Sequence, residues 1–169
     1  MARIVFILLI CFISITCNAQ SIEKRYSSHL SNAGVINFFH PKKLKKNTNV
    51  DMFVFDMTYI SHNDSVTLNC SFRIRNKYNI KLLNLKSGNN KIHSNDLFIL
   101  YREVKKHGYE IRVTSRFSFN EIKNVFKEHT PPVFEIILND GSYCMASYRK
   151  SAWEKESFNV TRILESINL

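Results

Sequence analysis

Hydrophobic and polar side chains alternate with a period of two over most of the chain beyond residue 50. The alternation is clearest between Ser65 and Arg75. One face of this segment carries Val66, Leu68, Cys70, Phe72 and Ile74, and the other carries Thr67, Asn69, Ser71, Arg73 and Arg75. The pattern is typical of a strand that buries one face in a core and shows the other to water. We therefore predict a half-buried antiparallel strand here.

The same period predicts strands over residues 51–60, 80–86, 97–104, 109–117, 133–138 and 142–149. Short turn signals separate several of them, at residues 61–64, 87–90, 105–108 and 139–141. Strands joined by turns this short pair antiparallel, because a parallel connection needs a long crossover. The sheet is therefore predicted to be mostly antiparallel.

The period changes to a helical one after residue 118. An apolar stripe over residues 119–129 predicts a helix, which the two prolines at 131–132 end. Ser118 and Glu121 match a capping box at its start. We therefore predict one helix between two hairpins.

A second capping box, Ser151 with Glu154, predicts a C-terminal helix. Phe158 lies off the apolar stripe of this helix, so the helix is expected to bend or to begin later. Together the elements predict an α+β fold with a mostly antiparallel sheet of about seven strands, one helix between hairpins and one C-terminal helix. A β-sandwich with added helices is the alternative.

Residues 1–19 have the pattern of a signal peptide. Arg3 supplies a positive charge, and residues 4–15 form an apolar stretch too short to span a bilayer. Cys17-Asn18-Ala19 places small residues where signal peptidase reads them. We expect cleavage after Ala19 and an exported, periplasmic or extracellular protein. The alternatives are a lipoprotein anchored through Cys17 and an uncleaved anchor.

Residues 20–50 show no clear period and contain a basic run from Lys42 to Lys46. We expect an irregular basic N-terminal segment here, followed by one α+β globular domain over residues 51–169. The chain is 169 residues long and 44% hydrophobic, which is enough for a core. It has no run of roughly 18 apolar residues, so no transmembrane helix is expected in the mature chain.

Charge gives the strongest hint about partners, because 24 Lys and Arg stand against 14 Asp and Glu, a formal net charge of +10. Four arginines occupy the polar faces of two predicted strands. If these strands are neighbours, the four form an anion-binding strip: Arg73, Arg75, Arg112 and Arg116. The partner of such a strip in an exported protein is an anionic envelope component, or else a partner protein. The alternative is a solvated face whose arginine stems cover apolar surface.

Nucleic acid is not expected as a partner. Tyr109 and Phe117 are aromatic residues close to the arginines in sequence, but they point to the opposite face of their strand. Stacking of bases requires the rings and the cations on one surface.

Residue patterns of known chemistry are sparse. The chain has no nucleophile elbow, phosphate-binding loop or glycine-rich dinucleotide loop. Asp56, His62 and Asp64 lie around one predicted turn and could approach each other, but a turn by itself also favours such residues. Cys70 and Cys144 permit one disulfide, and two buried free thiols are the favoured alternative. We predict no catalytic, cofactor-binding or metal site.

The chain resembles small exported proteins of Bacteroidota. The resemblance rests on the signal end Cys17 to Gln20, on Pro131-Pro132 with Asn139-Asp140-Gly141, on the segment Lys150 to Trp153, and on the Asn- and Ile-rich composition. It implies a place in the envelope or periplasm, and it transfers no active-site residue.

We therefore expect an exported, non-enzymatic domain that binds a partner or has a structural role in the cell envelope. One alternative is a small hydrolase, which needs a cleft with two titratable side chains within hydrogen-bond reach. A polyanion-binding module is a second alternative. A subunit of a larger envelope assembly is a third, and it would show an exposed apolar patch or an unpaired sheet edge.

Overall fold

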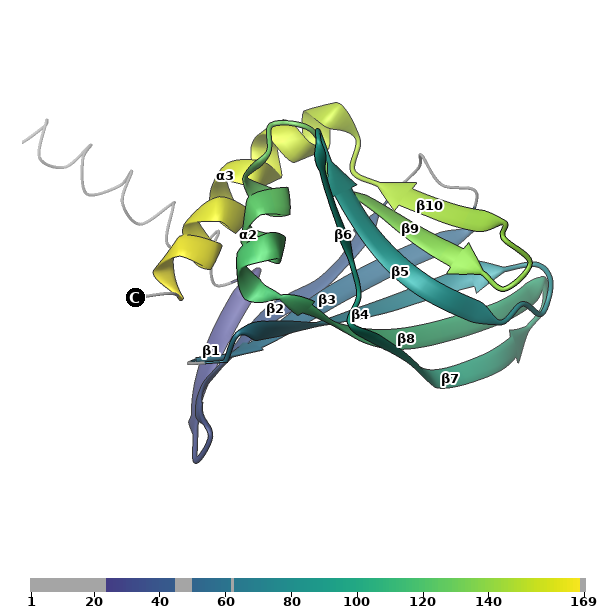
Figure 1. Cartoon of the computed structure of the whole chain (residues 1–169), viewed down its shortest axis with the longest axis horizontal. Helices are drawn as coiled ribbons and strands as arrows, with labels where there is room; N and C mark the ends of the chain where they lie inside the picture. Colours follow the sequence, from purple (N-terminus) through teal and green to yellow (C-terminus); the bar gives the residue numbers. More distant parts are fainter. Residues whose placement is uncertain (1–23, 45–49, 62, 168–169) are drawn as a thin grey trace, which may run out of the picture.

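Ten strands and two helices make up the computed structural model, which describes residues 24–44, 50–61 and 63–167 (Figure 1). The strands are β1 (Tyr26–Ser31), β2 (Gly34–Leu44), β3 (Met52–Ile60), β4 (Ser65–Ile74), β5 (Ile80–Ser87), β6 (Asn90–His93), β7 (Asp96–Lys105), β8 (Gly108–Ser118), β9 (Val133–Leu138) and β10 (Tyr143–Ser147). The helices are α2 (Phe119–Lys127) and α3 (Lys150–Ser166).

The strands form two antiparallel sheets. One has six strands in the order β1-β2-β3-β4-β8-β7, and the other has four in the order β10-β9-β5-β6. In Figure 1 the four-stranded sheet and both helices lie on the same side of the six-stranded sheet. The predicted α+β class is confirmed, with ten strands in place of about seven.

Alternating burial at the centre of the larger sheet follows the sequence pattern. Five inward side chains of β4 are buried: Val66, Leu68, Cys70, Phe72 and Ile74. β4 pairs with β8 in the register Ser71↔Arg112, so the two arginine-bearing strands are neighbours. The predicted strip depended on this condition. The half-buried antiparallel strand is thus confirmed.

Buried aromatic rings join the layers. Phe55 of β3 lies 4.7 Å from Phe134 of β9 and 6.4 Å from Phe126 of α2, between ring centroids. Trp153 of α3 lies 6.0 Å from Phe126, and its Nε1 donates to the Glu128 carbonyl at 3.1 Å. Because large buried rings dominate core energetics, these contacts fix the smaller sheet and the helices onto the larger sheet.

Residues 26–44 form two strands where the sequence predicted an irregular segment. β1 and β2 extend the six-stranded sheet beside β3. Glu156 of α3 holds this segment by accepting from Arg25 Nε at 2.9 Å and from Lys42 Nζ at 2.6 Å. The boundary at residue 50 is therefore wrong, because these strands belong to the same sheet as β3. The predicted signal peptide and Lys45 and Lys46 lie outside the described residues.

Both predicted helices form, but neither capping box does. Ser118 is the N-cap of α2 and makes no side-chain cap hydrogen bond. α3 begins at Lys150, one residue before the predicted cap, with Arg149 as an N-cap that also lacks such a bond. Phe158 lies off the apolar stripe of α3, and its side chain is accordingly 63% exposed. The Arg162 guanidinium lies 5.4 Å from its ring centroid. A later start of the helix is not needed.

Cys70 and Cys144 are buried free thiols, which confirms the favoured alternative for them. Burial raises the pKa of both thiols, so the reactive thiolate forms less readily. Within the described ranges, no helix combines the length and the apolar character needed to cross a bilayer.

Candidate ligand-binding pocket

An ion-pair network occupies the outer polar face of the six-stranded sheet. Arg112 of β8 donates from Nη2 to Asp56 Oδ2 at 2.7 Å and from Nη1 to Ser71 Oγ at 2.9 Å. Asn69 Nδ2 donates to the other carboxylate oxygen of Asp56 at 2.7 Å. The middle of the predicted arginine strip is therefore already neutralised by the protein itself.

Two more arginines of the strip are paired. Arg73 Nη2 donates to Glu110 Oε2 at 3.0 Å, and this bond holds the pKa of the Glu110 carboxyl below its usual range. Arg116 Nε lies 3.4 Å from Asp96 Oδ2. Of the four predicted residues, only Arg75 forms no ion pair with the described part of the chain. Three of the four arginines of the predicted strip are therefore paired with carboxylates of the protein itself.

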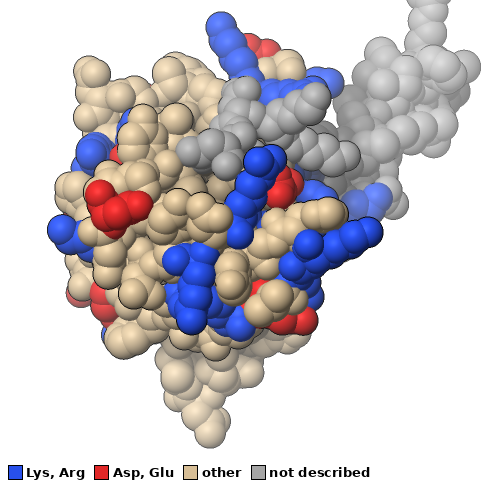
Figure 2. Space-filling model, turned by 90° about the vertical axis from the view of Figure 1, so that its right-hand side faces the viewer, with Lys and Arg blue, Asp and Glu red and all other residues tan. Residues whose placement is uncertain are grey.

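Arg73 and Arg75 instead meet at a cavity of about 330 Å³, which we call the basic-end cavity. Its lining comprises Asp51, Arg73, Ile74, Arg75, Asn76, Tyr78 and Cys144. It lies where β4 ends, at the end of the molecule that Figure 2 views. Lys and Arg side chains spread over this face, with acidic side chains among them. Two arginines of the predicted strip therefore share a cavity at the end of β4, with Asp51 beside them.

The structure does not bring Asp56 and Asp64 together around the predicted turn. Asp56 lies in the middle of β3, with its carboxylate engaged by Arg112 and Asn69. Asp64 is exposed in the turn that precedes β4, and His62 lies outside the described residues. No cluster of three metal-ligating side chains occurs within the described ranges. The residues of this turn fit the simpler role of forming it.

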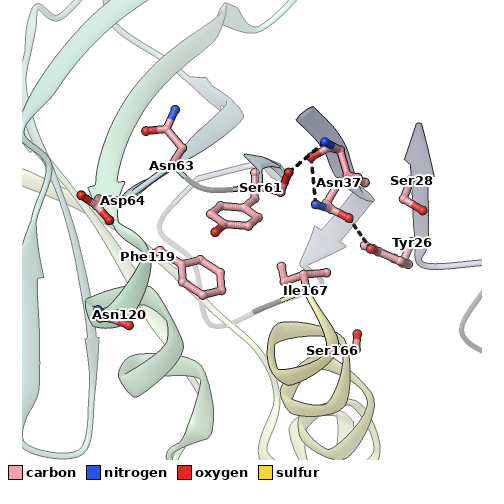
Figure 3. Close-up of a pocket in the computed structure, with 12 residues that line it drawn as sticks. Tyr26, Ser28, Asn37, Ser61, Asn63, Asp64, Phe119, Asn120, Ser166 and Ile167 are labelled. Atoms are coloured by element: carbon pink, nitrogen blue, oxygen red, sulfur yellow. Dashed lines mark hydrogen bonds between the residues drawn. The ribbon is translucent and has the colours of Figure 1, made fainter. Parts of the chain in front are cut away.

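A cavity of about 530 Å³ lies at the opposite end of the sheet, and we call it the polar pocket (Figure 3). Five segments meet there: β1, β2, the end of β3 with its following turn, the start of α2, and the end of α3. The lining residues are Tyr26, Ser28, Val35, Asn37, Tyr59, Ser61, Asn63, Asp64, Phe119, Asn120, Ser166 and Ile167.

One wall of the polar pocket is ordered by a chain of hydrogen bonds (Figure 3). The Tyr26 hydroxyl donates to Asn37 Oδ1, and Asn37 Nδ2 donates to the Val35 carbonyl at 3.2 Å. The Val35 amide in turn donates to Ser61 Oγ at 2.8 Å. Burial raises the pKa of Tyr26, against a lowering contribution from Ser28, so the phenol stays a neutral donor. This wall is fixed before any ligand arrives.

Aromatic rings form a second wall. The rings of Tyr59 and Phe119 stack with centroids 4.3 Å apart and planes 24° apart. The Phe119 amide donates to the Asp64 carbonyl at 2.8 Å, which fixes the start of α2 against the turn. Figure 3 shows Asn63, Asp64 and Asn120 on this side of the pocket. The two rings are almost fully buried, with Tyr59 4% and Phe119 3% exposed, so they support this wall from within the core while the amide and carboxylate groups line the pocket.

The charge of the polar pocket is low for a protein with a formal charge of +10. Among the lining residues that the structure describes, Asp64 is the one with a formal charge at pH 7, and eight others carry neutral hydroxyl or amide groups. No local sequence pattern predicts this site, since its residues come from separated segments and match no motif. It could be found only once the strands and helices were placed.

Comparison with protein-family models, with curated proteins and with solved structures finds no match to this chain.

Proposed function

We propose that this chain is an exported binding domain of the cell envelope that holds a neutral, polyhydroxylated ligand such as a saccharide in the polar pocket. The observation that carries the proposal is the lining itself, in which neutral hydroxyl and amide groups outnumber the one carboxylate of the described lining. A volume of about 530 Å³ lies within the range of small-molecule sites.

Elimination of other ligand classes supports this proposal. A purely apolar ligand would leave the hydroxyl and amide groups of the lining without partners, which costs free energy. Within the described lining, an anion would meet Asp64 and no cation, and a cation would have only Asp64 as its counter-charge. A ligand with several hydroxyls can satisfy these neutral groups by hydrogen bonding.

Binding is favoured over catalysis by what the lining offers. The titratable side chains of the lining, as far as the structure describes it, are Tyr26, Tyr59 and Asp64, and the hydrogen bond that Tyr26 makes in the wall goes to the amide of Asn37. Elsewhere, Glu156 does meet Lys42 within hydrogen-bond reach, but the cavity beside them holds only about 40 Å³. That space suits a water molecule rather than a substrate.

A panel of soluble probes tests the proposal. Isothermal titration with neutral disaccharides, uronate-containing disaccharides and alkyl alcohols should give saturable binding with the neutral sugars alone. That binding should be insensitive to salt, because it does not depend on ion pairing. Binding of the acidic sugars alone, or of none of the panel's sugars, contradicts the proposal.

A second candidate is anion binding at the basic-end cavity, which the pair Arg73 and Arg75 favours. Asn76 and Tyr78 add neutral hydrogen-bonding groups to the lining, while Asp51 opposes an anion there. This candidate keeps the predicted polyanion-binding role but moves it from the strip to the end of the sheet. Its ligand would be a phosphate- or carboxylate-bearing envelope component, and its binding would weaken with salt.

A further inference from the structure

Strand β7 ends the six-stranded sheet and exposes apolar side chains along its length. Phe98 is 59% exposed, Leu100 54% and Val104 74%, and Ile99 and Tyr101 are exposed as well. A bulge lies between Ile99 and Tyr101, and Leu100 has no partner residue on β8. We call these five residues the β7 edge. Contiguous exposed apolar surface on a sheet edge marks an interaction site.

The charges of β7 indicate what covers this edge. The strand carries two acids and two bases, Asp96, Arg102, Glu103 and Lys105, within a chain of net charge +10. A surface that recruits an acidic partner would carry more basic than acidic side chains, and β7 has no such excess. A balanced strand can instead meet a copy of itself without the repulsion that acts between two basic proteins elsewhere on their surfaces.

We propose that the β7 edge binds the β7 edge of a second copy of this chain, antiparallel and about a two-fold axis. Such an axis places one residue opposite its own copy. With Tyr101 on the axis and the bulge residue Leu100 unpaired, Leu97 lies opposite the partner's Val104 and Asp96 lies opposite the partner's Lys105. This alignment covers Val104, the most exposed apolar side chain of β7, twice, and it sets an acid against a base at each end.

The inference goes beyond the proposed function, because a dimer that binds no sugar and a monomer that binds one are both possible results. If both proposals hold, the dimer carries two polar pockets, so that a surface with many copies of one sugar is bound more tightly than a single sugar.

Sedimentation velocity of the whole mature protein over a wide concentration range tests the dimer. Val104→Lys removes an exposed apolar contact that the interface makes twice, so it should weaken the dimer by about a hundredfold. Leu30→Lys is the matched control, because Leu30 is 87% exposed on β1 at the other edge of the same sheet. Both sites are exposed, so neither substitution is expected to disturb folding, which circular dichroism checks.

A reversible dimer that Val104→Lys dissociates and Leu30→Lys leaves intact supports the proposal. A second readout is amide hydrogen exchange, in which the β7 amides should become more protected as the concentration rises. A monomer at every concentration overturns the proposal. A dimer that resists Val104→Lys, or one that Leu30→Lys dissociates equally, overturns it too.

Discussion

Arg112 and Asp56 form an ion pair at 2.7 Å across the outer face of the six-stranded sheet, although they are 56 residues apart in sequence. The side chains are 26% and 15% exposed, respectively, so the pair is only partly in water. Each also bonds a β4 side chain, Ser71 for the arginine and Asn69 for the aspartate. The pair therefore clasps β3, β4 and β8 together.

Removal of this clasp should lower stability more than removal of an exposed arginine from the same strand. Arg112→Ala leaves the Asp56 carboxylate half-buried with one donor fewer, and should cost about 1–3 kcal/mol in the free energy of unfolding. Arg116→Ala is the matched control, since its side chain is 63% exposed and its ion pair is longer, and it should cost under about 1 kcal/mol. Urea denaturation measures both. Equal losses would show that the clasp contributes nothing special.

The turn between β7 and β8 should not tolerate a side chain at Gly108. Its φ is +135°, and a Cβ there would lie 2.1 Å from the Ile74 carbonyl oxygen. Gly108→Ala should therefore cost at least about 3 kcal/mol or prevent folding. Gly141→Ala is the control, because its φ of +84° is also positive but its Cβ would meet nothing within 4 Å. We expect about 1 kcal/mol there by thermal denaturation. A Gly108→Ala protein that is as stable as the wild type would contradict the observed turn.

Acid should weaken the attachment of α3 to the N-terminal strands. Burial alone would raise the pKa of the Glu156 carboxyl, but hydrogen bonds from Arg25 and Lys42 outweigh burial and hold its pKa below the usual range. A lowered folded pKa means that Glu156 stabilises the fold above its unfolded pKa of about 4.3, and that this contribution is lost as the pH falls through the folded value.

The measurement is the difference in free energy of unfolding between the wild type and Glu156→Gln, followed from neutral pH into acid. The wild type should be the more stable at neutral pH, and the gap should close as the pH drops below the usual glutamate range. Glu154→Gln, on the exposed side of the same helix, supplies the control. A gap for Glu156 that stays constant down to low pH would argue against the ion pairs.

Two arginine substitutions separate anion binding at the basic-end cavity from anion binding along the predicted strip. If anions bind at the basic-end cavity, Arg75→Ala should weaken binding to anionic vesicles by about 1 kcal/mol at low salt. Arg116→Ala should change little, because Arg116 is far along β8 and pairs with Asp96. Vesicle cosedimentation at low and high salt provides the comparison. Equal effects of the two substitutions would favour the strip, and salt-insensitive binding would exclude both.

The central sheet could be predicted because its burial is local in sequence. Val66, Leu68 and Phe72 are buried on every second position, and the turn at 139–141 joins two strands as expected. β1 and β2 escaped prediction because their alternation is irregular. Asn37 is buried between neighbours that are not, and Phe38 is 38% exposed. A hydrogen bond from Tyr26 satisfies that asparagine, and no local pattern reveals it.

The candidate sites depended on register, which the sequence does not give. Arg73, Arg112 and Arg116 lie on the strands predicted for them and Arg75 follows the end of β4. Glu110 lies opposite Arg73 only in the observed pairing of β4 with β8. Asp56 faces Arg112 for the same reason, rather than joining Asp64 at the turn. The polar pocket draws on both ends of the described chain, from Tyr26 to Ile167, so only the assembled fold defines it.

The most direct test of the polar pocket compares two asparagines of one helix. Asn120 lines the pocket at the start of α2, whereas the exposed Asn124 lies one turn later and does not line it. Each is replaced by alanine, and the affinity for the best neutral disaccharide of the panel is measured by titration calorimetry. We expect Asn120→Ala to weaken binding by about 1 kcal/mol, roughly fivefold, through one lost hydrogen bond, and Asn124→Ala to leave it unchanged. Unchanged binding by the Asn120→Ala protein, or equal weakening by both variants, would contradict saccharide binding in the polar pocket.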